Sequence, residues 1–521
     1  MQLNLFKTSL WLMIVTISSK VLGLFRDVFV ARALGSGYQA DACILALNIP
    51  LILRRLFTDG VFNQAVVPIL NHNSSNFNKD FESNVSLLIG TFGLFFLIAS
   101  TLFILLSNIF VIFMGIGWFK EYLNDPYSTG GLSYVLASHL IKYTLPYLFF
   151  ISLAGLSCSI LNFLGKYYFP AILPMILNIV ILLFLYNYSY LGIEKELAVV
   201  IGVFFGGLCQ FFMSIVYLYK LNLLKYLKID FKHPLFRKTC KNLYYASLSN
   251  SVIIINVLIS TIILSFLKTG SISWFYYSQR LIDFPQSFIG MAFSLLFVPI
   301  FSKKFSALEL KDFNKLILQS FKVIQIFGIP AIIGLVYLAK PIIILLFYSN
   351  EFNKVDVDNT VNATYVLLAS LIFILFCKNL MIIFAAINKI KSTIKIGYLT
   401  IFMNIILSLS FSSFFGFLGV CFGLALSSLI QFSLLFNKLK RLKKINVNLE
   451  FYLFSLKILI ASFIMLLCID YFVPISSNLF FMTKLEISFA ISKVLFIGIL
   501  VYIGSILILK INPYKTLMKM S

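Results

Sequence analysis

The sequence predicts an all-α polytopic membrane protein with about fourteen transmembrane helices. Sixty per cent of the 521 residues are hydrophobic and only 12% are charged, whereas a soluble domain is about 45–50% apolar and about 25% charged. Apolar segments of the length that a membrane-spanning helix needs, about 20 residues, follow one another along most of the chain. A soluble enzyme, a disordered chain and a disulfide-rich secreted protein are therefore excluded.

Fourteen segments are apolar and long enough to span a bilayer. The second and ninth are longer than a bilayer requires and contain proline (Pro50; Pro330 and Pro341), so we expect them to bend or protrude. The first continues past any cleavage point of a signal peptide into Lys20 and Arg26, and we interpret it as a retained helix. The segments are 9–34, 39–70, 83–114, 133–161, 168–190, 198–219, 243–267, 272–301, 314–348, 359–388, 394–412, 414–437, 451–473 and 485–510.

Basic residues distinguish alternate loops between these segments. Loop 220–241 has seven lysines and arginines and loop 438–444 has five, whereas loops 117–131 and 191–197 have one lysine each. Because cytoplasmic loops are enriched in Lys and Arg, both termini are expected in the cytoplasm. This distribution accounts for most of the net charge of +23 without any binding of nucleic acid.

A weak internal repeat predicts the domain organisation. Gly35-Ser36-Gly37, followed by Pro50 and Pro68, has a counterpart in Gly270-Ser271, followed by Pro285 and Pro299, and Gly202-xxx-Gly206 has one in Gly419-xxx-Gly423. We therefore predict two parallel six-helix lobes, residues 1–222 and 223–440, and two additional transmembrane helices in residues 441–521.

Charged residues inside the predicted spans are the candidate functional residues. One charge at the centre of a bilayer costs about 2.5–3.5 kcal/mol, so these side chains are expected to face a hydrated cavity or one another. Five of the seven arginines (26, 32, 54, 55 and 280) lie in or beside spans, and arginine matches phosphate and carboxylate with two parallel hydrogen bonds. The candidate substrate-binding residues are Lys20, Arg26, Arg54, Arg55, Arg280 and Lys378, and the candidate supporting or gating acids are Asp27, Asp41, Asp59 and Asp283.

The basic candidates outnumber the acidic ones, which favours an anionic substrate. Arg55 and Asp59 are four residues apart and Arg280 and Asp283 three apart, so each acid is placed to hold its arginine between visits of an anion.

No catalytic residue, metal site or bound cofactor is expected, because the seven cysteines lack a CxxC motif, the three histidines are isolated and no GxxxxGK[ST] motif occurs. Membrane potential or an ion gradient is then the expected driving force.

Two stretches of the chain contain motifs of a known family. They are Ser19-Lys20-Val21-Leu22-Gly23, Arg26-Asp27, Asp41-Ala42, Leu53-Arg54-Arg55-Leu56-Phe57, Gly60, Phe62, Gln64-Ala65, Pro68, Gly270-Ser271, Ser273-Trp274, Tyr276-Tyr277, Arg280-Leu281 and Phe284-Pro285. With these motifs the chain resembles the bacterial MurJ/MviN lipid II flippases, a family within the MATE-like (multidrug/oligosaccharidyl-lipid/polysaccharide exporter) superfamily. The resemblance implies two six-helix lobes with two C-terminal helices that form a lipid-facing groove. Charges required in the family map onto Lys20, Arg26, Asp41, Arg54, Arg55, Asp59, Arg280 and Lys378, with Lys20 in place of the usual arginine and Asp59 in place of the usual glutamate.

The implied function is transport rather than catalysis. An undecaprenyl-pyrophosphate-linked peptidoglycan precursor would cross the inner membrane by alternating access, with Arg26, Arg54, Arg55 and Arg280 gripping the pyrophosphate. The expected partners are this precursor, membrane lipids and the cell-wall synthesis machinery, and the expected state is a monomer. Two alternatives use the same fold: a flippase for another polyprenyl-linked oligosaccharide, and a multidrug exporter, which the basic excess disfavours. A membrane glycosyltransferase, suggested by Asp356-x-Asp358, would lack a soluble catalytic domain.

Overall fold

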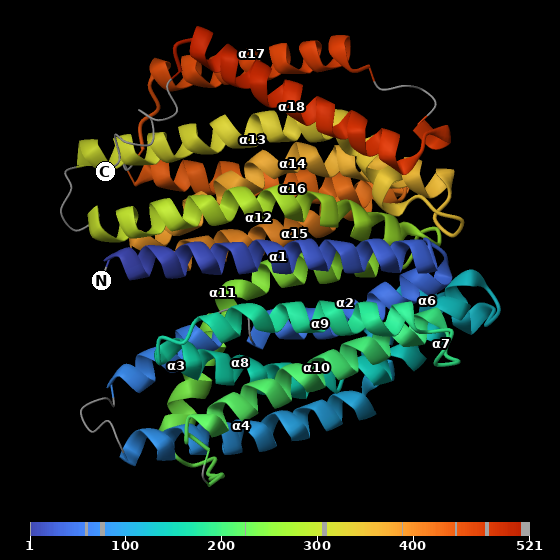
Figure 1. Ribbon diagram of the computed structural model, residues 1–521, viewed down its shortest axis with the longest axis vertical. Coiled ribbons are helices and arrows are strands. Elements are labelled where there is room, and N and C mark those ends of the chain that lie inside the picture. Colours follow the sequence, from blue (N-terminus) through green and yellow to red (C-terminus); the bar gives the residue numbers. More distant parts are fainter. Residues whose placement is uncertain are drawn as a thin grey trace. The chain divides into compact units, whose positions relative to one another are not determined.

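The computed structural model confirms the all-α prediction (Figure 1). Within the residues it describes there are α-helices and one short 3-10 helix but no strand. The described residues are 2–57, 61–72, 79–224, 226–304, 310–387, 389–442, 445–474 and 479–511.

The chain divides into two compact units, residues 1–273 and 274–521. In the first unit α11 packs against α2 and α3, although the sequence grouped it with the second lobe; the lobe boundary at residue 222 stays a prediction. The helices of this unit are α1 Gln2–Leu34, α2 Tyr38–Phe57, α3 Val61–His72, α4 Lys79–Leu105, α5 Ser107–Met114, α6 Ile116–Asn124, α7 Thr129–Thr144, α8 Tyr147–Phe163, α9 Tyr168–Tyr186, α10 Lys195–Lys220 and α11 Pro234–Leu264.

The second unit begins within the first turn of α12. In it α14 packs against α13 and α16, and α15 packs against α16. The two additional C-terminal helices, α17 and α18, pack against each other and against α13, where the Tyr502 hydroxyl donates to the carbonyl oxygen of Ile326 at 2.7 Å. The helices are α12 Ser271–Lys304, α13 Leu310–Phe347, α14 Lys354–Ala386, α15 Ile390–Phe415, α16 Phe417–Arg441, α17 Leu449–Phe472, the 3-10 helix η2 Leu479–Phe481 and α18 Lys484–Ile508.

Each of the fourteen predicted segments corresponds to one helix or to two consecutive helices, and the breaks within segments 83–114 and 133–161 were not predicted. Segment 83–114 contains α4 and α5, which meet at Leu106, and segment 133–161 contains α7 and α8. Pro146 directly precedes α8, and proline has no backbone N–H to continue a helix. Helix α13 is continuous through Pro330 and Pro341 and is 38 residues long. At 1.5 Å per residue this is about 57 Å, well beyond the ~30 Å hydrocarbon core.

Ten helical segments of the described residues are long and apolar enough to cross a membrane by length and composition. They correspond to ten of the predicted spans; the other four lie in α1, α2 with α3, α11 and α12. Three of these four carry most of the charged candidate residues, which lowers their hydropathy. In α11 the apolar stretch of the described residues is the shorter Ile254–Leu264.

The internal repeat is supported at two kinds of position. Gly35 and Gly270, with φ of 66° and 94°, form the turns just before α2 and α12, and this left-handed conformation favours glycine. A Cβ on Gly206 would lie 3.2 Å from Leu177 Cα in α9, and a Cβ on Gly423 would lie 2.8 Å from Ser408 Cα in α15. Each Gly-xxx-Gly motif therefore brings its helix against the helix before it in the chain.

Candidate functional site

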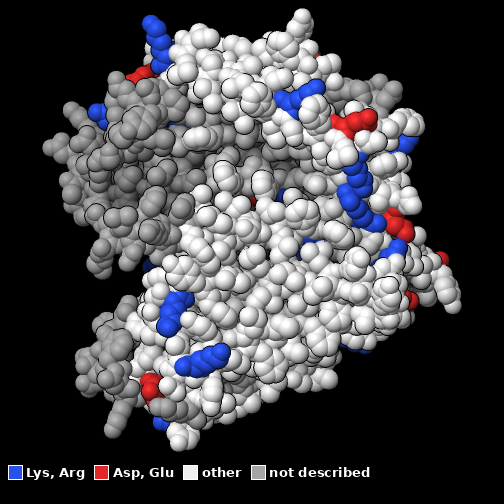
Figure 2. Space-filling model, in the orientation of Figure 1, with Lys and Arg blue, Asp and Glu red and all other residues white. Residues whose placement is uncertain are grey.

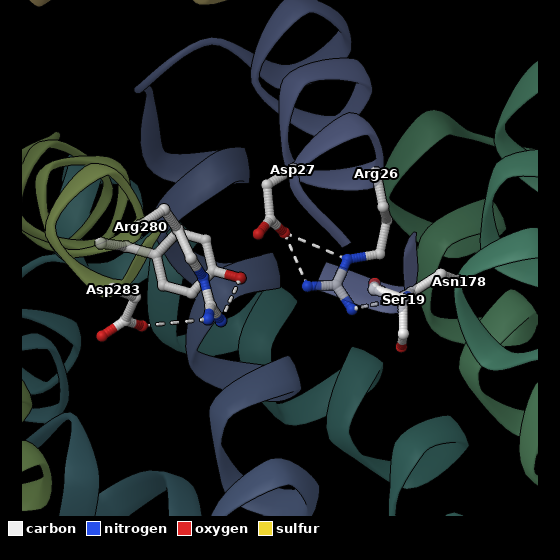
Figure 3. A network of polar contacts seen from close by, with 7 residues as sticks. Ser19, Arg26, Asp27, Asn178, Arg280 and Asp283 are labelled. Carbon is white, nitrogen blue, oxygen red and sulfur yellow. Dashed lines mark hydrogen bonds and ion pairs between the residues drawn. The ribbon is translucent and has the colours of Figure 1, made fainter. Parts of the chain in front are cut away.

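Arg26 lies at the centre of a buried polar network in the first unit (Figure 3). Its Nε and Nη2 donate to Asp27 Oδ1 at 3.0 and 2.7 Å, and its Nη1 donates to Asn178 Oδ1 at 2.9 Å. Asn178 is on α9, which packs against α1, and its Nδ2 donates to the carbonyl oxygen of Ser19 at 3.4 Å. The guanidinium is thus fixed in a defined orientation inside a membrane helix bundle.

The burial of this network makes it electrostatically important. Arg26 is 9% exposed and Asp27 is 3% exposed, and the removal of one partner of a buried ion pair costs about 3–5 kcal/mol because the other charge is left uncompensated. Asp27 therefore compensates the positive charge of Arg26 within the helix bundle.

Arg280 is held by residues of its own helix, α12, in the second unit (Figure 3). Its Nη2 donates to the Tyr276 hydroxyl at 2.8 Å, and its Cζ lies 4.5 Å from the centre of the Tyr276 ring. Its Nη1 lies 3.5 Å from Asp283 Oδ2. The expected pairing across three residues is present, and the tyrosine one turn earlier adds a cation–π contact.

Asp41 has a structural partner that the sequence did not indicate. It is 1% exposed; its Oδ2 accepts from the Gly270 N–H at 2.7 Å, and its Oδ1 accepts from the Ser273 N–H at 2.8 Å and from the Ser273 hydroxyl. These N–H groups belong to the beginning of α12, which has no intrahelical acceptors for them. A carboxylate here also offsets the positive end of the helix dipole.

The other predicted site residues are placed as follows. Lys20 is exposed on α1 and Lys378 is half-buried on α14. Arg54 and Arg55 lie in the last turn of α2, but their side chains are not among those described, and Asp59 lies outside the described residues. Their participation in one site stays a prediction.

The acidic residues Asp356 and Asp358 both form contacts at the beginning of α14. Asp356 forms a capping box with Asn353 and accepts from Trp274 Nε1 at 3.1 Å, and Asp358 pairs with Lys340 at 3.0 Å. Throughout the part of the chain that the structure describes, no group of three or more His, Cys, Asp or Glu is arranged to hold a metal ion. The two carboxylates therefore have structural roles at the beginning of α14.

Two residues of these networks were not among the candidate site residues of the sequence analysis. Asn178 is the one polar residue, apart from tyrosines, within the apolar helix α9, and a lone amide in a membrane span is a usable signal. Tyr276 is four residues before Arg280, the spacing of neighbours on one helix face. In each case the arginine was recognised but the side chain that orients it was not.

Comparison with known proteins gives a consistent assignment. A family model described as "Lipid II flippase MurJ" matches residues 30–490. A probable lipid II flippase MurJ of Vibrio cholerae serotype O1 is 35% identical over 441 residues, covering 84% of this chain and 83% of the relative. A solved structure of lipid II flippase MurJ in an inward closed conformation is 27% identical, with a TM-score of 0.78 and coverage of 95% of this chain and 97% of that chain.

A more distant structure supports the fold alone. A crystal structure of a eukaryotic MATE transporter is 15% identical, with a TM-score of 0.57 and coverage of 87% of this chain and 96% of that chain. The MATE-like architecture expected from the sequence is confirmed, and the ten apolar helices identify a multi-pass membrane protein. With the family match spanning most of the chain, the protein belongs to the lipid II flippase MurJ family, a family of transporters and not of enzymes.

Proposed function

We propose that this protein moves lipid II, the lipid-linked peptidoglycan precursor, from the cytoplasmic to the periplasmic leaflet of the bacterial inner membrane. Family membership supports the substrate. The observation that carries the mechanism is the buried, oriented guanidinium of Arg26, held by Asp27 and Asn178. A pyrophosphate requires fixed cations, and a planar guanidinium meets its oxygens with paired hydrogen bonds.

Arg26 binds the pyrophosphate by exchange of anions. When lipid II is absent, Asp27 neutralises Arg26; when the pyrophosphate arrives, its oxygens replace the carboxylate, and Asn178 keeps the guanidinium in register. Arg280, held by Tyr276 and Asp283, acts in the same way from the second unit. Arg54, Arg55, Lys20 and Lys378 supply further positive charge, with Asp59 beside Arg55.

Transport then follows an alternating-access cycle in which two bundles open in turn to either side of the membrane. The sugar–peptide head passes through hydrated space while the prenyl tail stays in lipid, where its hydrophobic surface is most stable. We infer that both termini lie in the cytoplasm, that the protein acts as a monomer beside the cell-wall synthesis machinery, and that membrane potential or an ion gradient drives the cycle. Its contribution to the cell is peptidoglycan synthesis and hence cell shape.

Complementation of a conditional lipid II flippase mutant, with detection of lipid II at the outer surface, tests the role of Arg26. Arg26→Gln alone leaves Asp27 buried without its cation, so loss of function could reflect misfolding. The informative variant is therefore Arg26→Gln/Asp27→Asn, which removes both charges. We expect a membrane-inserted protein at normal levels that fails to support growth and exposes at least about tenfold less lipid II, the equivalent of about 1.4 kcal/mol.

The matched control is Arg441→Gln, which removes an exposed arginine at the end of α16 and should complement fully. Arg26→Lys keeps the charge but loses the planar donor and should be intermediate. Full complementation by the double variant would overturn the proposed role of Arg26. Complementation of a mutant in a different lipid-linked glycan flippase, but not of the lipid II mutant, would instead identify another polyprenyl-linked substrate.

A further inference from the structure

The described residues of the connection between α10 and α11, 221–224 and 226–233, lie along the first turns of α4 in the first unit (Figure 1). The Ser86 hydroxyl donates to the Leu223 carbonyl at 3.1 Å, and the Asp230 N–H donates to the Thr91 hydroxyl at 3.1 Å. The Lys228 ammonium donates to the Ser83 hydroxyl at 2.9 Å. Side chains of α4 thus hold the connection at three points.

The docking depends on a glycine of α4. A Cβ on Gly90 would overlap the carbonyl oxygen of Lys228, and that oxygen is backbone, so it cannot rotate away. Leu223 of the connection and Phe236 in the first turn of α11 belong to the buried hydrophobic cluster that includes Phe92 of α4. The connection therefore occupies a fitted position against α4.

These contacts place the connection beside the first part of a candidate membrane span. Residues 81–105 of α4 form a candidate membrane span, and Ser83 and Thr91 lie two and ten residues inside it, or about 3 and 15 Å at the helical rise. The headgroup region is roughly 5–7 Å thick on each side of the bilayer. Non-helical backbone persists at such depth where protein groups satisfy it, as Ser86 and Thr91 do here.

The outer side of the connection combines exposed apolar and basic side chains. Tyr226 is 78% exposed and Leu227 is 66% exposed. Loop 220–241 contains seven basic residues and a single acid, Asp230. We call the following exposed residues the interfacial edge: Tyr226, Leu227, Ile229 and Phe231, with Lys228, Lys232, Arg237 and Lys238.

We propose that the interfacial edge binds anionic phospholipid of the leaflet that faces the basic loops. The apolar side chains enter the boundary between headgroups and acyl chains, as the apolar face of an interfacial segment does, and the basic side chains pair with lipid phosphates. Phospholipid is favoured over a protein partner because the edge lies beside a candidate membrane span, exposes apolar side chains and carries a surplus of positive charge that matches an anionic leaflet. This site is separate from the residues proposed to bind the pyrophosphate.

Fluorescence quenching by brominated lipids tests this proposal in the full-length protein. The reporter is Tyr226→Trp, reconstituted in phosphatidylcholine vesicles that contain brominated phosphatidylglycerol or, at the same mole fraction, brominated phosphatidylcholine. The signal of the three native tryptophans is subtracted using the unmodified protein. Each basic residue near an anionic surface favours association by about fivefold. We therefore expect brominated phosphatidylglycerol to quench the added tryptophan at least about threefold more strongly than brominated phosphatidylcholine does.

Three variants in the reporter background separate the parts of the proposal. Lys232→Gln/Arg237→Gln/Lys238→Gln should reduce the ratio of quenching by the two lipids to about one, whereas Lys120→Gln/Lys195→Gln/Lys354→Gln removes three lysines of predicted outer loops and should leave the ratio unchanged. Gly90→Val should weaken quenching by both lipids, because it displaces the connection from α4. The proposal would be overturned if the two lipids quenched the reporter equally. It would also be overturned if neither lipid quenched the added tryptophan while aqueous iodide quenched it fully, or if the Gly90→Val variant gave an unchanged signal.

Discussion

At the scale of single residues, the charged side chains that appear alike in the sequence have different tasks. Arg26 and Arg280 are oriented cations with neighbouring acids, whereas Asp41 stabilises the beginning of α12. The sequence identified all three because charge in an apolar segment is conspicuous. It could not assign the role of Asp41, because Gly270 and Ser273 are more than two hundred residues away in the chain.

The capping role of Asp41 leads to a stability prediction. Asp41→Ala removes the acceptor of two backbone N–H groups and leaves them buried, which we expect to lower the free energy of unfolding by about 1–3 kcal/mol. Asp41→Asn keeps one acceptor oxygen and should lose less. The measurement is thermal unfolding of the purified protein in detergent or nanodiscs.

The matched control for Asp41 is Asp358→Ala. Asp358 pairs with Lys340, but its side chain is 55% exposed, and exposed ion pairs contribute about 0–1 kcal/mol. Its melting temperature should therefore stay close to that of the unmodified protein. If Asp41→Ala also melts with the unmodified protein, the carboxylate does not stabilise α12.

At the scale of helices, small residues determine which neighbours approach most closely. Gly202 and Gly206 bring α10 against α9, and Gly419 and Gly423 bring α16 against α15. Sequence analysis found both motifs and could predict close packing, since Gly-xxx-Gly is typical of membrane helix pairs. It did not indicate which helix was the partner, because many apolar helices offer equivalent faces. Helix breaks such as that before Pro146 were missed because hydropathy continues across them.

The α15–α16 pair gives a packing prediction. A Cβ on Gly423 would lie 2.7 Å from the backbone nitrogen of Ser408, so the Gly423→Ala variant must push the helices apart. Overpacking of this kind typically costs about 1–3 kcal/mol, and we expect a lower melting temperature and a lower yield of folded protein.

Gly504→Ala in α18 is the matched control, because a Cβ there meets nothing within 4 Å. The same change at this position should be neutral or slightly stabilising, since alanine favours helix by about 1 kcal/mol over glycine. Equal melting temperatures for the two alanine variants would show that Gly423 does not limit the approach of α15 and α16.

At the scale of the whole molecule, composition and charge distribution were sufficient to predict a polytopic helical transporter, because a bilayer restricts the architectures that such a chain can adopt. The participation of the candidate residues in one substrate site stays a prediction. Arg54 and Arg55 are in α2, Arg280 is in α12 and Lys378 is in α14, and no local sequence pattern relates helices that are so distant along the chain.

The proposed driving force predicts that the direction of transport depends on the charge carried across the membrane. A pyrophosphate that moves outward carries negative charge away from the negative interior, and each elementary charge that crosses 100 mV gains about 2.3 kcal/mol. We therefore expect purified protein in vesicles to flip lipid II faster when a potassium diffusion potential makes the compartment on the side of the basic loops negative, and more slowly when the potential is reversed. Arg26→Gln/Asp27→Asn should show no response to the potential, because binding is lost. If the rate follows an imposed proton or sodium gradient at zero potential and ignores the potential itself, the energy comes from a coupled ion and the pyrophosphate crosses with its charge compensated.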